Sequence, residues 1–338
     1  MDLSVVIVNY QTYELTKNTI NSILEYEYPF SLEVIVVDNA SADDSLSKLR
    51  EYFKDKVTFI ASTENNGFAA GNNQALKISK GRYVLLLNSD TVVWENTLED
   101  IYNYMEGHDD VGAAGCRVLL ENGELDKACK RTFPNVKNSF FRLFHIPTNS
   151  KDDNYNLDNL PDDEVYEIDC LTGAFMFIRK EALDEVGFLD ETFFMYGEDI
   201  DLCFRIKHAG WKIIYYGKSK ITHFKGASSK KQKSKLIYEF YRAMYIYYKK
   251  HHESGCGNFK RNMNRQSGTC WSAAMASPVK TDCGSSLKPS RHSLRTNTGM
   301  SISATFSTTL RIPIWKSTIF TTSGFNSETP RLSASHTR

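Results

Sequence analysis

Short apolar runs alternate with amphipathic segments along the first 120 positions of this 338-residue chain. Continuous apolar runs of this length are typical of strands that are buried on both faces of a sheet. Because segments with helical spacing of apolar residues separate the runs, the pattern predicts an α/β fold with a mainly parallel, doubly wound sheet. The predicted strands are residues 3–8, 32–37, 57–61, 83–87 and 111–120.

The segments between these strands predict helices with one apolar face each. The helix after the second strand is expected to begin at Ser41, whose hydroxyl suits an N-cap. The helix after the third strand is expected to end near Ser79. The apolar faces of the other predicted helices carry Ile20, Ile23 and Leu24; Leu46, Leu49 and Phe53; and Leu98, Ile101, Tyr102 and Met105.

Beyond residue 120 the alternation becomes less regular. Residues 123–165 form a polar, loop-rich stretch, and a long irregular insertion is usually a functional loop or a disordered one. A strand at 175–178, a short helix to Val186, a helix from Glu198 and late strands at 211–216 and 221–224 are predicted next. Residues 238–250 predict a tyrosine-rich, partly basic helix, suited to packing at the domain edge or to lying at a membrane interface.

Residues 253–338 differ in character from the rest of the chain. Serine and threonine are frequent, eleven basic residues accompany only three acidic ones, and no periodicity is sustained. We interpret this stretch either as a disordered basic tail or as the product of a shifted reading frame, and we place no site in it. The ordered domain is therefore expected to span residues 1–252.

Charge and cysteine content exclude several classes of protein. Lysine plus arginine and aspartate plus glutamate both number 41, so no nucleic-acid partner is indicated. The seven cysteines are scattered without a CxxC pair, which argues against a zinc site or a disulfide framework and favours a reducing compartment. Neither a signal peptide nor an apolar segment long enough to cross a bilayer is visible. We expect a cytoplasmic protein, with peripheral attachment at the inner face of the cell membrane left open.

Acidic residues follow the apolar runs at two strand ends. Asp38 comes directly after the second strand, and the triplet Asn88-Ser89-Asp90 follows the fourth. In open α/β sheets, ligands bind in the crevice outside the carboxyl ends of the strands. A carboxylate there can hold a hard divalent cation together with water and substrate phosphates. The alternative is that the triplet only forms a turn, since all three residue types favour turns.

A second pair of acidic residues opens a predicted helix. Glu198 and Asp199 follow the sequence FFMYG and lie where the helix dipole favours anions. They are therefore either capping residues or the acidic groups of a site. Asp201 and Arg205 are spaced for an ion pair one helical turn apart. His223, which stands alone in the sequence, is either a structural residue or a ligand.

Glycine and asparagine are concentrated in residues 65–73, NNGFAAGNN. The glycines suit a tight loop whose backbone N–H groups approach a ligand closely. The spacing is neither the dinucleotide-binding GxGxxG nor the GxxxxGK[ST] P-loop. A nucleotide-sugar pyrophosphorylase would carry a basic, glycine-rich triphosphate loop near the N-terminus, and VNYQTYE is not one.

Seven motifs of the chain together resemble the family 2 glycosyltransferases with the GT-A fold, most closely their bacterial rhamnosyltransferase-like branch. The motifs are VVIVNYQT, VVDNASADDS, NNGFAAGNN, YVLLLNSDT, LTGAFMFIRKEAL, FFMYGEDIDLCFR and ITHFKGAS. They cover about residues 1–252 in the order and spacing of the family. The resemblance implies that residues 1–120 bind the nucleotide-sugar and that residues 121–252 form the acceptor and catalytic half.

The resemblance also implies the site residues. Asp199 matches the general base, and Asp90 matches the DxD position that binds Mg²⁺ or Mn²⁺, with Asn88 in place of the first acid. His223 matches a position that often supplies a further metal ligand. The implied acceptor-site residues are Glu198, Thr172, Gly173 and Ala174. The implied nucleotide-sugar contacts are Val8, Asn9, Asp38, Asn39, Asn66, Gly67, Asn72, Asn88 and Ser89, with Asn9 and Asp38 at the base and ribose.

The implied activity is an inverting, metal-dependent transfer of a sugar to a saccharide or lipid-linked saccharide in the synthesis of a cell-surface polysaccharide. The branch favours dTDP-rhamnose as donor, and related branches use UDP-sugars. A divalent ion stabilises the charge of the leaving diphosphate, and a carboxylate removes the proton of the acceptor hydroxyl. Because Asn88 leaves one fewer carboxylate for the metal, the alternative is a catalytically inactive protein that binds nucleotide-sugars or carbohydrates.

Overall fold

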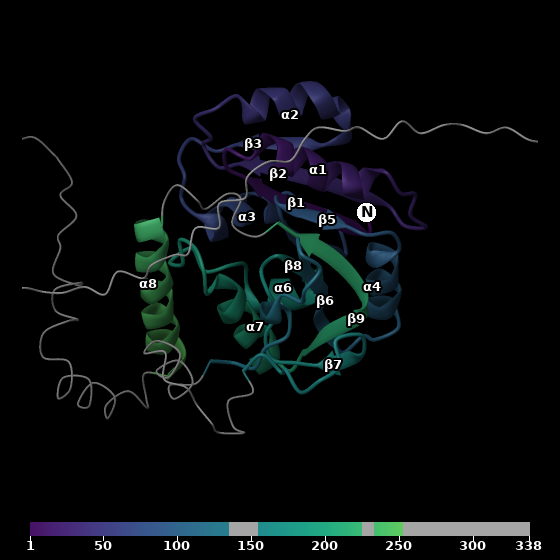
Figure 1. Ribbon diagram of the computed structural model, residues 1–338, viewed down its shortest axis with the longest axis vertical. Coiled ribbons are helices and arrows are strands. Elements are labelled where there is room, and N and C mark those ends of the chain that lie inside the picture. The colour runs from purple at the N-terminus through teal and green to yellow at the C-terminus, as the bar shows by residue number, and fades with distance from the viewer. Residues whose placement is uncertain (135–154, 225–232, 253–338) are drawn as a thin grey trace, which may run out of the picture. The chain divides into compact units, whose positions relative to one another are not determined.

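The computed structural model describes residues 1–134, 155–224 and 233–252 (Figure 1). These residues belong to the unit formed by Met1–Ala276. Residues 135–154 of the predicted loop-rich stretch and the tail from residue 253 lie outside the described residues. Of the helices within the described ranges, none is both long enough and apolar enough to cross a membrane.

A nine-stranded sheet lies at the centre of the described residues, in the order β3-β2-β1-β4-β8-β6-β9-β5, with β7 paired to β9. Strands β1 to β4 run parallel, and β6 and β9 are parallel to each other. The strands β5, β7 and β8 run in the opposite direction. The predicted α/β fold with a mainly parallel sheet is therefore confirmed. The strands are β1 (Leu3–Asn9), β2 (Leu32–Asp38), β3 (Thr58–Ala61), β4 (Tyr83–Asn88), β5 (Thr91–Val93), β6 (Val111–Leu120), β7 (Val165–Glu167), β8 (Phe175–Arg179) and β9 (Lys212–His223).

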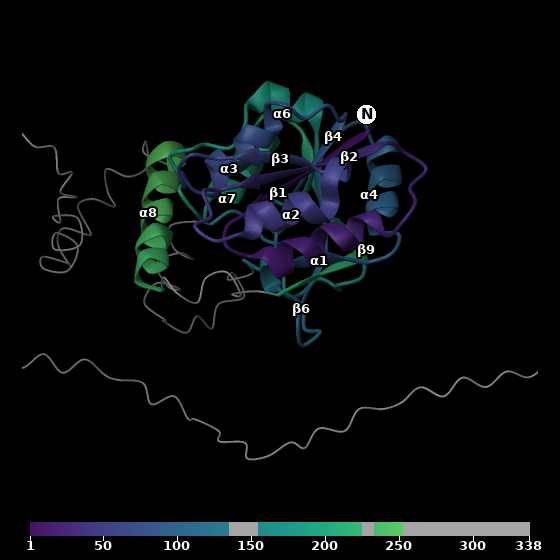
Figure 2. The ribbon, with the colours of Figure 1, turned by 90° about the horizontal axis from the view of Figure 1, so that it is seen from above.

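Helices cover both faces of the sheet, as a doubly wound fold requires. Figure 2 shows α1 (Tyr13–Leu24) and α2 (Ser45–Phe53) on one side of β1 and β2, with α3 (Phe68–Leu76) and α6 (Lys180–Val186) on the other. Both α4 (Thr97–Glu106) and α7 (Glu198–His208) pack on β6 and β9. The last described helix is α8 (Lys233–His252), and short 3₁₀ turns occur at Lys54–Lys56 and Lys127–Cys129.

The hydrophobic pattern explains the packing of the central strand and of α4. All residues from Tyr83 to Leu87 are at most 1% exposed, because β4 has β1 on one side and β8 on the other. The spacing of Leu98, Ile101 and Met105 turns all three into the core, where each is completely buried. These elements confirm the predicted central strand and the amphipathic helix that follows it.

Three predicted boundaries are wrong. Ser41 does not cap α2, because its hydroxyl accepts the backbone N–H of Gln11, and α2 begins only at Ser45. The two predicted late strands form the single strand β9, since residues 217–219 bulge between two stretches paired with β6 and do not end the strand. The predicted glycine and asparagine loop becomes helical at Phe68, so that its second half belongs to α3.

Candidate active site

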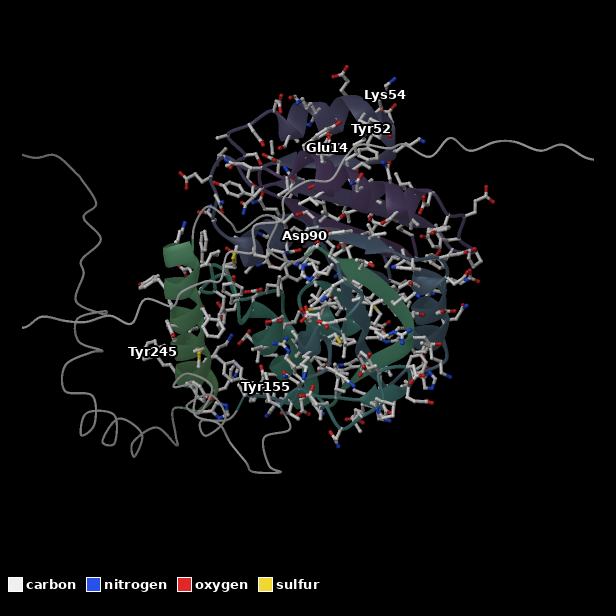
Figure 3. The ribbon with its side chains drawn as sticks, viewed as in Figure 1. Glu14, Tyr52, Lys54, Asp90, Tyr155 and Tyr245 are labelled. Carbon is white, nitrogen blue, oxygen red and sulfur yellow. The ribbon has the colours of Figure 1, made fainter. Side chains whose placement is uncertain are left out.

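The carboxyl ends of the parallel strands bring several predicted residues to one edge of the sheet. Asn9, at the end of β1, is paired in register with Asp38 at the end of β2. Asn88 ends β4 beside the end of β1. His223 ends β9, where it is paired with the residue that follows Asp90. Figure 3 shows Asp90 between the β1–β4 part of the fold and the end of β9. The edge therefore matches the position in which open α/β sheets bind ligands.

Asn9 holds Asp38 from a completely buried position. Its amide nitrogen donates to Asp38 Oδ1 at 2.6 Å and to Ser41 Oγ at 3.3 Å. Its amide oxygen accepts from the hydroxyls of Thr12 and Thr16 at 3.0 and 2.8 Å. These four bonds fill the hydrogen-bonding capacity of the Asn9 amide. Asn9 therefore orients the carboxylate of Asp38, and any effect of Asn9 on ligand binding would act through that carboxylate.

Asn39 fixes the start of α3. Its amide nitrogen donates to Asn65 Oδ1 and to the carbonyl of Gly67, both at 3.0 Å, and its buried Oδ1 has no hydrogen-bond partner among the described residues. Gly67 has φ +94°, and a Cβ there would lie 2.2 Å from the carbonyl oxygen of Phe194. That oxygen accepts the N–H of Phe68 at 2.8 Å. The start of α3 is thus tied to the turn that precedes α7, and only glycine fits the contact.

The remaining predicted nucleotide contacts differ in exposure. Asn66 is exposed in front of α3, whereas Val8 and Ser89 are buried at the sheet edge. Asn72 lies within α3, is 1% exposed, and donates its amide to the carbonyl of Phe68 at 2.9 Å. Of these four side chains, Asn66 is therefore the one that is open to a ligand without rearrangement.

Asp90 and His223 form a buried pair at the same edge. His223 Nε2 lies 3.1 Å from Asp90 Oδ1 and 3.4 Å from the amide nitrogen of Asn88, while its Nδ1 lies 3.9 Å from Asp126 Oδ2. Burial lowers the pKa of the imidazole, but the carboxylates of Asp126 and Asp90 outweigh this effect and raise it to about 9. The negative field of these carboxylates favours a cation at this corner of the site.

The residues of this corner fit a hard divalent cation that shares its coordination with a substrate. Asp90 offers carboxylate oxygens, and His223 offers an imidazole nitrogen once a cation displaces the proton that the ring carries at neutral pH. Within the described ranges, no group of three or more His, Cys, Asp or Glu side chains is arranged to hold a metal ion. A cation held by Asp90 and His223 would thus take further ligands from water and phosphate oxygens, as Mg²⁺ commonly does.

Asp199 is held by hydrogen bonds at both carboxylate oxygens. Its Oδ2 accepts from the Arg131 guanidinium at 2.8 Å and from the Gly173 N–H at 3.2 Å, and its Oδ1 accepts the Ile200 N–H at 2.8 Å. The side chains of Arg131 and Asp199 are 10% and 13% exposed, and Arg131 also donates to the carbonyl of Leu171. A carboxylate has about four acceptor positions, so capacity remains at Asp199 for the hydroxyl of an acceptor.

The segment Thr172 to Ala174 connects the two acidic parts of the site, the Asp90–His223 pair and the Asp199–Arg131 pair. The N–H of Asn88 donates to the carbonyl of Ala174 at 3.1 Å, and the next residue back, Gly173, donates its N–H to Asp199. This connection exists because β8 runs antiparallel to β4, which places the start of β8 beside the end of β4. Two consecutive residues therefore link the Asn88-Ser89-Asp90 turn to Asp199.

Glu198 is buried beside Asp199 at the first turn of α7. Its side chain is 6% exposed, and Oε2 has no hydrogen-bond partner in the part of the chain that the structure describes. Burial and the neighbouring charge of Asp199 raise the pKa of Glu198 to about 8. At neutral pH this carboxyl group is therefore mostly protonated and can donate a hydrogen bond.

Glu198→Gln is expected to stabilise the fold above about pH 5. The folded protein binds the Glu198 proton more tightly than the unfolded chain does, so this group lowers the free energy of unfolding as the pH rises from about 4.5 to about 8. A tenfold difference in proton affinity is worth about 1.4 kcal/mol, so a gain of a few kcal/mol at pH 8 is expected. Urea unfolding at pH 5 and pH 8 measures it, with the exposed Glu181→Gln as control. An equal gain at both pH values would contradict this assignment.

Three residues of the site were not assigned a role from the sequence. Arg131 and Asp126 lie in the irregular stretch after residue 120, where no periodicity indicates what they contact. Asn73 is buried in α3 and binds the backbone of Leu189 through both its amide nitrogen (2.8 Å) and its oxygen (3.1 Å). The signal available in the sequence was the position of Asn73 next to Asn72 in a motif rich in asparagine. In the structure, Asn73 connects α3 to the segment before α7.

Comparison with known proteins shows which family the sequence matches. The model of the family described as "Glycosyltransferase like family 2" matches residues 2–238. The chain is 28% identical over 213 residues to the low-salt glycan biosynthesis hexosyltransferase Agl10 of Haloferax volcanii, covering 61% of this chain and 62% of that protein. It is 29% identical over 159 residues to rhamnosyltransferase WbbL of Escherichia coli K12, covering 44% and 57%.

The fold also matches solved structures. The mannosyltransferase PcManGT of Pyrobaculum calidifontis, in complex with GDP-Man and Mn²⁺, superposes with a TM-score of 0.51 at 21% identity, over 70% of this chain and 60% of that one. This likeness supports the fold. The matched region spans less than two thirds of the length of Agl10 and of WbbL.

Proposed function

The chain belongs to the glycosyltransferase family 2, and from that premise we propose that it transfers a sugar from a nucleotide-diphosphate donor to a hydroxyl of a saccharide or lipid-linked saccharide. The observation that carries the proposal is the link between two acidic corners, Asp90 with His223 and Asp199 with Arg131, through Ala174 and Gly173. A transfer reaction requires one group at the leaving diphosphate and another at the attacking hydroxyl. The site has an acidic group available for each.

On the donor side, Asp38 and the start of α3 are proposed to hold the nucleoside. Asn9 orients the Asp38 carboxylate, and Asn39 with Gly67 keeps the loop before α3 in place. Asp90 and His223 would hold Mg²⁺ or Mn²⁺, which would neutralise charge on the diphosphate as it leaves. Asn88 contributes its amide beside His223, 3.4 Å from Nε2.

On the acceptor side, Asp199 is proposed to take the proton of the attacking hydroxyl. The hydrogen bonds from Arg131 and Gly173 fix its Oδ2, and a positioned base of this kind contributes about 10²–10⁴-fold to the rate. Glu198, mostly protonated near pH 7, would donate a hydrogen bond to the acceptor. Thr172 is proposed to contact the acceptor on the same side of the site. One displacement with one base predicts inversion at the anomeric carbon.

We favour dTDP-rhamnose as donor and a cell-surface polysaccharide as product, with a UDP-sugar as the second choice. The motifs that the chain shares with the rhamnosyltransferase-like branch support this choice, as does the similarity to WbbL over 159 residues. The similarity to the hexosyltransferase Agl10 supports the broader class of hexose donors. A panel of donors therefore belongs in every assay of this protein.

The donor corner is tested by Asp90→Asn. Wild-type protein is expected to bind a nucleoside diphosphate more tightly with Mn²⁺ than with a chelator, because Asp90 contributes the carboxylate ligand. The variant is expected to lose about tenfold or more of that metal-dependent gain, as measured by calorimetric titration. The exposed Asp109→Asn serves as control and should behave as wild type. A variant that keeps the full gain while remaining folded would remove Asp90 from the proposed site.

A further inference from the structure

The outward face of α8 carries tyrosine and basic side chains in one line. Tyr238, Tyr245 and Lys249, with the adjacent Tyr241 and Arg242 between the first two, are separated by three, four or seven positions, so the five residues lie on one side of the helix. We call these five residues the α8 stripe. The three tyrosines are 55%, 38% and 46% exposed, so a large part of each side chain faces solvent. Figure 3 shows Tyr245 on the side of α8 that points away from the sheet.

The opposite face of α8 is fastened to the segment that leads into and forms α7. The completely buried Asp201 lies 2.8 Å from Lys250 Nζ and 2.7 Å from His251 Nε2. Lys250 also pairs with Asp190 at 2.6 Å, and Tyr247 is buried against Phe193. Because these contacts occupy the inward face, the α8 stripe stays turned outward.

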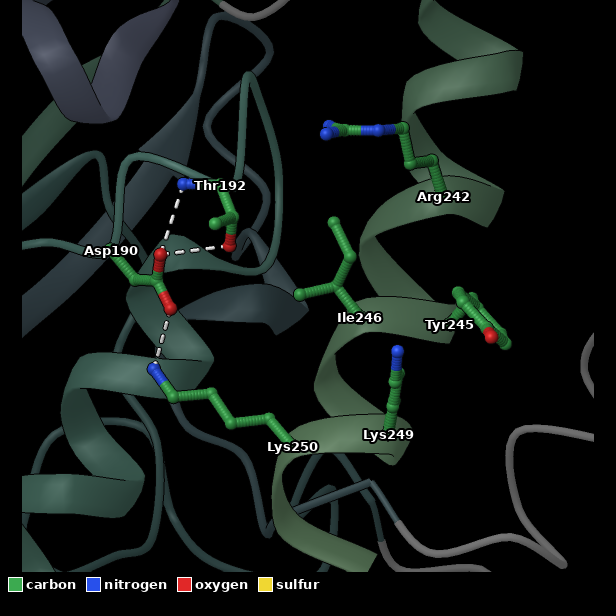
Figure 4. A pocket seen from close by; sticks show the side chains of 7 residues that line it. All are labelled: Asp190, Thr192, Arg242, Tyr245, Ile246, Lys249 and Lys250. Carbon is green, nitrogen blue, oxygen red and sulfur yellow. Dashed lines mark hydrogen bonds and ion pairs between the residues drawn. The ribbon is translucent and has the colours of Figure 1, made fainter. Parts of the chain in front are cut away.

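A pocket of about 520 Å³ lies between the α8 stripe and the turn at Asp190 (Figure 4). Asp190 accepts hydrogen bonds from Thr192 and forms an ion pair with Lys250. Its carboxylate is therefore already neutralised by a residue of the pocket. The lining has three basic residues and one acidic residue, which gives it a net positive charge. The lining residues are Asp190, Thr192, Arg242, Tyr245, Ile246, Lys249 and Lys250.

Positive charge in the domain is concentrated on α8 and on residues 225–232 just before it, which carry three lysines and no acidic residue. The sequence of α8 has five lysine and arginine residues and one acidic residue, whereas residues 1–224 have 22 basic and 37 acidic residues. An acidic domain with one basic helix is repelled by a long polyanion such as nucleic acid, which contacts a wide surface. It can still place that single helix on an anionic surface.

We propose that the α8 stripe docks on an anionic lipid bilayer. Tyrosine rings are favoured at the level of the lipid headgroups, and lysine and arginine next to them are attracted to anionic lipids within a Debye length of the surface. The pocket between Arg242 and Lys249 provides room for a headgroup phosphate. The docking does not depend on sugar transfer.

The same helix borders the turn in front of Glu198. The ring of Phe240 lies 6.0 Å from the ring of Tyr196, and Lys235 Nζ lies 4.4 Å from the ring centre of Phe194. A bilayer bound by the α8 stripe would therefore be separated from α7, the helix that supports the acceptor side of the site, by the width of α8, which is about 10–12 Å. If the acceptor is lipid-linked, as the proposed function allows, the enzyme and its substrate would meet at one surface.

Vesicle flotation tests the docking with the full chain and no donor present. The vesicles consist of phosphatidylcholine alone or of phosphatidylcholine with phosphatidylglycerol. Wild-type protein is expected to float with the anionic vesicles and to detach as salt is raised. Tyr245→Ser combined with Lys249→Gln is expected to weaken this binding by about tenfold, since one lysine near the surface alone is worth about fivefold.

A matched control uses an exposed tyrosine and lysine elsewhere. The control carries Tyr52→Ser in α2 and Lys54→Gln directly after α2, and Figure 3 labels both residues. This variant should bind vesicles as wild type does. Because residues 253–338 add further basic residues, both variants retain them. Equal binding by the two variants, or no binding to anionic vesicles, would overturn the proposal. So would tighter binding to single-stranded RNA than to vesicles.

Discussion

Asp199→Asn is expected to reduce sugar transfer by about 10²–10⁴-fold while donor binding stays nearly unchanged. The amide cannot accept the proton of the acceptor hydroxyl, yet it has almost the size of the carboxylate. The donor contacts proposed above lie at Asp38 and Asp90, on the other side of the Ala174 link. Nucleoside diphosphate release measures transfer, and calorimetric titration of the donor measures binding.

The control for this variant is the exposed Asp184→Asn, which removes a charge from α6 and should leave both quantities unchanged. Thermal unfolding of both variants separates a catalytic loss from a folding defect. If donor affinity fell by the same factor as the rate, Asp199 would be a binding residue and not the base.

Arg131→Met is expected to destabilise the protein by about 3–5 kcal/mol and to abolish most of the transfer activity. The side chain is buried, and its loss leaves the carboxylate of Asp199 without its nearest positive charge. The substitution also removes a hydrogen-bond donor to the carbonyl of Leu171, the residue directly before the segment Thr172 to Ala174. Chemical denaturation gives the change in stability, and nucleoside diphosphate release gives the change in rate.

The double variant Arg131→Met/Asp199→Asn distinguishes a charge effect from a packing effect. With neither charge left in the site, it should be more stable than Arg131→Met alone, by about 1–3 kcal/mol of coupling. Arg131→Lys keeps the positive charge and should retain more stability than the methionine variant, with an altered pH profile of transfer. A double variant that is no more stable than the single one would show that the pair contributes little.

The sequence predicted the donor half of the fold well because its signals are local. The first strands are continuous apolar runs, and each ends at a polar residue, so Asn9, Asp38 and Asn88 could be placed at one edge from the topology alone. The Asp201–Arg205 pair was also confirmed, at 2.9 Å, because its spacing falls within one helix. Local spacing is the common feature of these successes.

The acceptor half depends on contacts that local patterns do not specify. Arg131 pairs with a carboxylate 68 positions later, and it stands in a stretch without periodicity. The reversal of β8, which brings Gly173 to Asp199, follows from how the second half is folded back and not from the apolar run itself. Asp126 was missed for the same reason: its neighbour His223 comes from the end of β9.

The most direct test of the central claim compares wild type, Asp90→Asn and Asp199→Asn in one experiment with a panel of nucleotide-sugars and Mn²⁺. The account predicts that wild type releases nucleoside diphosphate from at least one donor, that Asp90→Asn loses metal-dependent binding, and that Asp199→Asn binds the donor but releases little product. If wild type binds a donor yet releases no more diphosphate than Asp199→Asn, with acceptors or with water, the protein is a nucleotide-sugar binder and the transferase proposal is wrong.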